Sequence, residues 1–105
     1  MRLVISTVPI DKAGELAHKI VGERLAACVN IIPKVRSIYT WKGAVEDDEE
    51  ALLFIKTTAD GVASLSRRLK EIHPYDVPEI VSLNINDNEG NPEYLAWVSD
   101  SVRQT

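Results

Sequence analysis

Cysteine is almost absent from this chain, because Cys28 is the only one among 105 residues. A lone thiol cannot close a disulfide within the chain, so the fold depends on an ordinary hydrophobic core. Neither paired cysteines nor a His-x-x-x-His pair is present, so the usual ligand patterns of a structural zinc site are also missing.

Long hydrophobic runs are missing as well. No apolar stretch approaches the ~20 residues that cross a bilayer. The opening residues 1–7 are too few and too mixed in character to form a signal peptide. We therefore expect a cytoplasmic protein without a membrane partner.

Positive charge is in short supply. Twelve Lys and Arg residues face sixteen Asp and Glu residues, and the resulting net charge of −4 argues against a nucleic-acid partner. Glycine-rich phosphate loops are absent, and no nucleophile stands beside a recognisable base. These absences predict neither an enzyme nor an organic cofactor.

The residues that are present predict one domain over residues 1–105, with ordinary apolar (45%) and charged (27%) contents. We place Asp11 and Asp60 as N-caps of the first two helices, and Asn91, followed by Pro92, as the cap of the last. The predicted strands are 3–8, 27–32, 35–41, 52–55 and 80–85, and the predicted helices are 13–21, 62–72 and 92–102.

Two arms of a hairpin are unusually long in this prediction. Residues 27–41, interrupted at Pro33, lead to a turn near residues 42–44 and then to the acidic stretch 46–50, which we interpret as a solvated tip. Each arm is about twice the common strand length of ~5–6 residues. The apolar run 52–55 predicts a central strand covered on both faces. So small a chain cannot cover both arms, and we expect another subunit to pair with the overhang.

The order of the predicted elements is β-α-β-β-α-β with a closing helix. This order is typical of an α+β ferredoxin-like fold, in which two helices cover one face of an antiparallel sheet. The closing helix is an addition to that motif.

The segment 72–81 joins the second helix to the last strand and carries several polar candidates. His73 precedes Pro74, which pushes His73 out of the helical region and predicts the end of the helix. Pro74 and Pro78 also restrict the backbone that carries Tyr75. Two interpretations stay open, a rigid connector and a loop that faces a ligand.

Metal-binding candidates are few. Cys28 and His73 are ligand types that copper accepts, although the apolar neighbours of Cys28 in its strand favour a packed thiol. His18 is more typical of a surface residue than of a metal ligand. The acidic stretch 46–50 lacks the spacing and the glycine of a calcium loop.

A small-molecule cleft is a further hypothesis. Aromatic rings together with an ammonium and a carboxylate are typical of such clefts, and here they would meet at a subunit boundary. The same rings are also typical anchors of an interface between subunits. The cleft candidates are Trp41, Lys56, Tyr75, Glu79, Tyr94 and Trp97.

Five motifs cover essentially the whole chain: Glu23–Pro33, Ser37–Gly43, Lys56–Thr58, His73–Ile80 and Tyr94–Trp97. This set, in this order, resembles the CutA family of divalent-cation tolerance proteins. The resemblance implies a homotrimer of ferredoxin-like subunits, similar to the PII signalling proteins, in which long hairpins extend the sheets of neighbours. It also implies a role in tolerance to divalent metal ions, above all copper.

A copper site carries over from this resemblance only in part. Some members of the family have a cysteine where this chain has Ser6, and a histidine pair where it has Ile72 and His73. Only His73 matches, so the resemblance implies weak copper binding with His73 as the ligand.

Three functions stay open. The first is a trimeric, non-enzymatic protein of the response to divalent metal ions. The second is a PII-like sensor with a small molecule in the cleft between subunits, where Lys56 favours an anionic group. The third is a structural trimer that anchors another protein.

Overall fold

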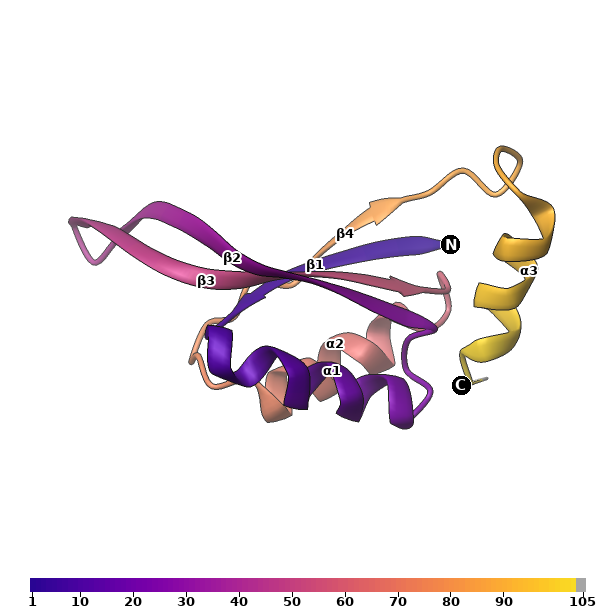
Figure 1. Cartoon of the computed structure of the whole chain (residues 1–105), viewed down its shortest axis with the longest axis horizontal. Coiled ribbons are helices and arrows are strands. Elements are labelled where there is room, and N and C mark those ends of the chain that lie inside the picture. The colour runs from indigo at the N-terminus through magenta and orange to yellow at the C-terminus, as the bar shows by residue number, and fades with distance from the viewer. Residues whose placement is uncertain (104–105) are drawn as a thin grey trace.

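The computed structural model describes residues 1–103 of the chain. Its element order confirms the predicted β-α-β-β-α-β arrangement with a closing helix (Figure 1). None of the helices in these residues is long and apolar enough to cross a bilayer. The elements are β1 (Arg2–Val8), the short 3-10 helix η1 (Ile10–Lys12), α1 (Ala13–Gly22), β2 (Cys28–Trp41), β3 (Ala44–Thr57), α2 (Val62–Ile72), β4 (Val81–Asn84) and α3 (Pro92–Ser101).

One antiparallel sheet organises the chain, with the strand order β2-β3-β1-β4. Helices α1 and α2 lie side by side on one face of this sheet, and α3 stands apart at one end (Figure 1). Alternate residues of β3 point at the two helices, so Leu53 and Ile55 are fully buried against Ile20, Leu65 and Leu69. This contact forms the main core.

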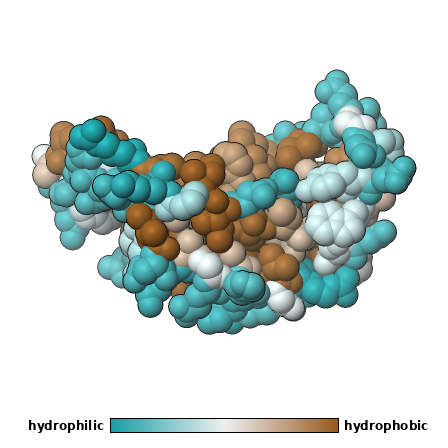
Figure 2. Space-filling model, in the orientation of Figure 1, coloured by the Kyte–Doolittle hydropathy of each residue, from teal (hydrophilic) through white to brown (hydrophobic). Residues whose placement is uncertain are grey.

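The second face of the sheet is left uncovered by the chain itself. Leu52 and Phe54 are only half-buried there, and Val81 and Leu83 of β4 are each 52% exposed. Apolar surface runs over the middle of the molecule, between the hairpin and α3 (Figure 2). The predicted central position of residues 52–55 is confirmed, but within one chain only one face of that strand is covered.

The predicted long hairpin is confirmed, since β2 and β3 each contain 14 residues. Its turn has two residues with positive φ, Lys42 at 49° and Gly43 at 82°, which matches the twist of the arms. The register shifts between Ile32 and Val35, where Pro33 interrupts the ladder. The distal half projects beyond the helices (Figure 1). The acidic stretch 46–50 belongs to strand β3 rather than to the tip, which corrects the prediction.

The predicted helix caps are confirmed at one position and wrong at two. The Asn91 side chain accepts a hydrogen bond from the Glu93 N–H and so caps α3. Asp11 lies inside η1 instead, because a 3-10 turn precedes α1. Helix α2 starts after Gly61, and the Thr58 hydroxyl rather than Asp60 accepts the Gly61 N–H.

Candidate functional site

Within one chain, the six cleft candidates lie in three separate places. Trp41 ends β2 at the hairpin tip, whereas Lys56 lies at the other end of the hairpin, paired with Cys28. Tyr75 and Glu79 belong to the connector 73–80 between α2 and β4. Their meeting in one cleft therefore needs more than one subunit, and it stays a prediction.

Lys56, Tyr94 and Trp97 are the three candidates that the chain does bring together. The Lys56 ammonium donates to the Tyr94 hydroxyl at 3.1 Å and lies 5.4 Å from the centre of the Tyr94 ring. The rings of Tyr94 and Trp97 are 5.5 Å apart and remain 39% and 47% exposed. The hydrogen bond that Lys56 donates to Tyr94 raises the pKa of Lys56, so the ammonium stays charged. Such a cluster can bind an anion with a flat apolar part.

The connector is fastened to the sheet through His73 and Tyr75. The His73 ring is 8% exposed, and its Nε2 lies 2.9 Å from the Thr7 carbonyl, which can only accept. Its Nδ1 accepts the Tyr75 N–H at 3.1 Å. These partners fix the neutral tautomer with the proton on Nε2. Desolvation lowers the pKa of His73, and the Thr7 carbonyl and Glu50 oppose that change only in part.

This geometry does not fit a copper ion at His73 as the chain is folded. Both ring nitrogens already take part in hydrogen bonds, so neither offers a free lone pair to a metal. Across residues 1–103, no three His, Cys, Asp or Glu side chains lie close enough together to hold a metal ion. The Ser6 hydroxyl is fully buried on the helix side of β1, and Ile72 is half-buried. Copper would have to draw the His73 ring out of its two hydrogen bonds.

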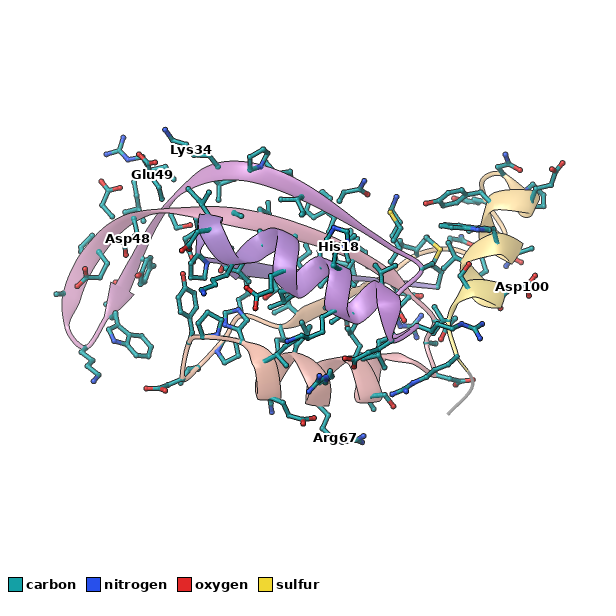
Figure 3. The ribbon with its side chains drawn as sticks, turned by 60° about the horizontal axis from the view of Figure 1, so that its bottom comes forward. His18, Lys34, Asp48, Glu49, Arg67 and Asp100 are labelled. Carbon is teal, nitrogen blue, oxygen red and sulfur yellow. The ribbon has the colours of Figure 1, made fainter. Side chains whose placement is uncertain are left out.

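The remaining candidates lie on the surface. His18 is exposed on α1 (Figure 3), as predicted. Cys28 is half-exposed rather than packed, because its side of β2 is the uncovered face of the sheet. Two of the five acidic residues in 46–50 form ion pairs along the hairpin, Asp47 with Arg36 at 2.7 Å and Glu49 with Lys34 at 3.3 Å. These pairs use two of the five carboxylates, and within residues 1–103 the others are not grouped with enough further ligands to hold a metal ion.

Two residues that make important contacts in the structure, Glu50 and Arg24, were not predicted from the sequence. Glu50, assigned to a solvated acidic stretch, is 7% exposed and accepts the Tyr75 hydroxyl at 2.8 Å. Glu50 directly precedes the apolar run 51–55, and this position was the indication in the sequence that Glu50 is buried. Arg24 holds the end of α3 through its side chain, and nothing in the local pattern of residues indicates that contact.

Comparison with known proteins adds the decisive observation. The sequence pattern of the family described as "CutA1 divalent ion tolerance protein" matches residues 2–101. The chain belongs to this family. It is 50% identical to "Divalent-cation tolerance protein CutA" of Thermus thermophilus, over 95% of this chain and 96% of that relative. It is 46% identical to the human "Protein CutA" over 88% of this chain, but spans only 51% of that longer relative.

Solved structures agree with the fold. The PII-like protein CutA of Nostoc, solved in apo form, superposes with a TM-score of 0.94 at 33% identity, with 98% of both chains covered. The Thermus thermophilus divalent cation tolerance protein superposes with a TM-score of 0.91 at 48% identity, over 98% of this chain and 100% of that one. The family resemblance and the PII-like, ferredoxin-like fold predicted from the sequence are thereby confirmed.

Proposed function

We propose that the chain works as a homotrimeric, non-enzymatic protein in tolerance to divalent metal ions, and that it binds copper weakly through His73. Membership of the divalent ion tolerance family supports the metal role. The observation that supports a trimer is the distal half of the hairpin. It projects beyond the helices that cover the rest of the sheet, so a neighbouring subunit would have to cover it (Figure 1). Three copies would complete one another's sheets.

The distribution of exposed apolar residues supports this assembly. On the hairpin, Val45 is 75% exposed, Ile38 is 62% exposed and Trp41 is 46% exposed. Strand β4, at the opposite edge of the sheet, also exposes its apolar side chains. Apolar area of this kind, next to two unpaired strand edges, is typical of a surface that a partner covers.

Weak copper binding follows from the cost of freeing His73. To bind His73, a metal ion must replace two hydrogen bonds and move a buried ring. In return it gains only one imidazole ligand. Copper titration by calorimetry should therefore give low affinity for the native chain and none for His73→Ala. Ser6→Cys should tighten binding, since it adds a thiol on β1 next to Thr7, whose carbonyl contacts His73.

Two controls make this titration specific. Cys28→Ser removes the half-exposed thiol, and His18→Gln removes the exposed imidazole of α1, so neither should change the affinity at His73. Equal copper affinities for the native chain and His73→Ala would remove His73 from the proposal.

A second candidate function is a small-molecule sensor, and the cluster of Lys56, Tyr94 and Trp97 favours it. A thermal-shift screen of nucleotides and aromatic carboxylates should find ligands that stabilise the native chain but not Lys56→Met. Lys34→Met is the matched control, because Lys34 is an exposed lysine of the hairpin. A broad screen without a hit would count against this candidate.

A further inference from the structure

A cavity of about 240 Å³ lies between α1 and the end of α2. Pockets that hold drug-sized ligands occupy roughly 300–1,000 Å³, so this cavity suits a smaller molecule. None of its walls belongs to the cluster of Lys56, Tyr94 and Trp97. The residues that line it are Lys12, Glu15, Leu16, Lys19, Ile72 and Pro74.

The cavity lies on the side of the molecule that the proposed assembly leaves open. Helices α1 and α2 lie on one face of the sheet, whereas the subunits would share the hairpin and the opposite face (Figure 1). Figure 3 looks onto these helices, with the exposed residues His18 of α1 and Arg67 of α2 labelled. A small molecule can therefore reach the cavity in the single chain and in the assembly.

The walls carry charges of both signs. Lys12, Glu15 and Lys19 are spaced by three and four residues, so their side chains lie along one side of this helical segment. Among residues 1–103, none of these three charges takes part in an ion pair. Because Glu15 lies between the two lysines, an ammonium and a carboxylate on one small molecule can meet opposite charges next to each other.

The end of α2 adds acceptors beside the same cavity. Pro74 has no N–H to donate to the Lys70 carbonyl, four residues before it. The Tyr75 N–H donates to the His73 ring at 3.1 Å rather than to the Glu71 carbonyl. Carbonyls at a helix C-terminus that lack these donors attract positive charge. An ammonium group is therefore favoured at this end of the cavity.

The floor of the cavity is apolar, because Leu16 is buried, Ile72 is half-buried and Pro74 closes one side. We propose that the cavity binds a free α-amino acid with an aliphatic side chain, such as leucine. The ammonium lies against Glu15 and the end of α2, the carboxylate against a lysine, and the side chain against the floor. A simple anion would face Glu15, and a simple amine would face two lysines, so a zwitterion matches the walls best.

The test is a titration of the isotope-labelled native chain with L-leucine, followed by backbone chemical shifts in NMR spectra. Because the charges are exposed and the cavity is open, we expect a dissociation constant of about 1 mM. The shifts should saturate together and concentrate in residues 12–19 and 72–75. Three analogues should bind more weakly than leucine: glycine lacks the side chain, N-acetyl-L-leucine lacks the ammonium, and L-leucinamide lacks the carboxylate.

Variants separate the two kinds of charge. Glu15→Gln, and Lys12→Met combined with Lys19→Met, should each weaken leucine binding about two- to fivefold, since exposed ion pairs contribute modestly. Arg67→Gln and Glu89→Gln change exposed charges outside the cavity and should leave the affinity unchanged. Equal affinities for leucine and N-acetyl-L-leucine would overturn the proposal, because the ammonium would then make no contact. Shifts that fail to saturate, or that centre elsewhere in the chain, would also overturn it.

Discussion

The hydroxyl of Tyr75 donates a 2.8 Å hydrogen bond to the carboxylate of Glu50, which joins the connector after α2 to the hairpin. Glu50 is 7% exposed, so water cannot readily replace this donor. Burial and the hydrogen bond to Glu50 raise the pKa of Tyr75, which keeps the phenol protonated. The contact therefore persists throughout the physiological pH range.

Tyr75→Phe should lower the free energy of unfolding by about 1–3 kcal/mol, because it leaves a buried carboxylate without its donor. Urea denaturation near neutral pH measures this change. Tyr39→Phe is the matched control, since Tyr39 donates to Asp48 at 2.6 Å but Asp48 is exposed. If Tyr39→Phe lowered the free energy of unfolding as much as Tyr75→Phe, the burial of Glu50 would not explain the effect.

Stability should depend on pH through His73. Burial lowers the pKa of His73 below its usual 6.5, so the unfolded chain takes up this proton more readily than the folded chain. The stabilising contribution is complete above about pH 6.5 and is lost as the pH falls through that value toward the folded pKa. Urea midpoints measured between about pH 8 and about pH 5 should therefore decline on the acid side.

Two variants isolate this pH dependence. His73→Gln carries no titrating ring and should flatten the decline, whereas His18→Gln, which changes the exposed histidine of α1, should retain it. The same decline in His73→Gln as in the native chain would assign the effect to other groups.

Removal of the Ser6 hydroxyl should stabilise the chain. The hydroxyl is fully buried, and within residues 1–103 it has no hydrogen-bond partner. Ser6→Ala should raise the free energy of unfolding by about 1 kcal/mol, since an unsatisfied polar group is lost. Thr57→Val should do the opposite, because the buried Thr57 hydroxyl donates to the Leu25 carbonyl at 2.9 Å. Thermal unfolding of both variants checks the pair, and a destabilised Ser6→Ala would contradict the prediction.

Local rules predicted much of the fold and less of the site. Strand and helix patterns gave the element order, and Asn91 before Pro92 marked a true helix start. Asp11 failed as a cap because it lies inside the 3-10 turn before α1, and Asp60 failed because α2 starts after Gly61; neither helix has a side-chain cap. The apolar neighbours of Cys28 predict a packed thiol, but neighbours in a strand do not show which face of the sheet the helices cover.

Contacts between distant segments were beyond local rules. Arg24 and the end of α3 lie far apart in sequence, and an arginine where glycine is usual gives no indication of its partner. The pairing of Glu50 with Tyr75 depends on where the connector crosses the hairpin. Aromatic and charged residue types made Lys56, Tyr94 and Trp97 cleft candidates, and only the structure shows that these three meet within one chain.

Trp41→Ala should weaken assembly if neighbouring copies share the distal hairpin. Trp41 is 46% exposed at the end of β2, where no other part of the same chain covers its ring fully. Analytical ultracentrifugation over a dilution series should show dissociation of Trp41→Ala at concentrations where the native chain stays associated. Val21→Ala is the control, because Val21 is similarly exposed (38%) but lies on α1, away from the hairpin.

The proposed function rests on assembly, because a lone chain leaves its hairpin and one sheet face uncovered. Multi-angle light scattering of the native chain, eluted by size exclusion near neutral pH, tests this directly. We expect one monodisperse species with three times the mass of a single chain, unchanged on dilution. A monodisperse species with the mass of a single chain would contradict the account.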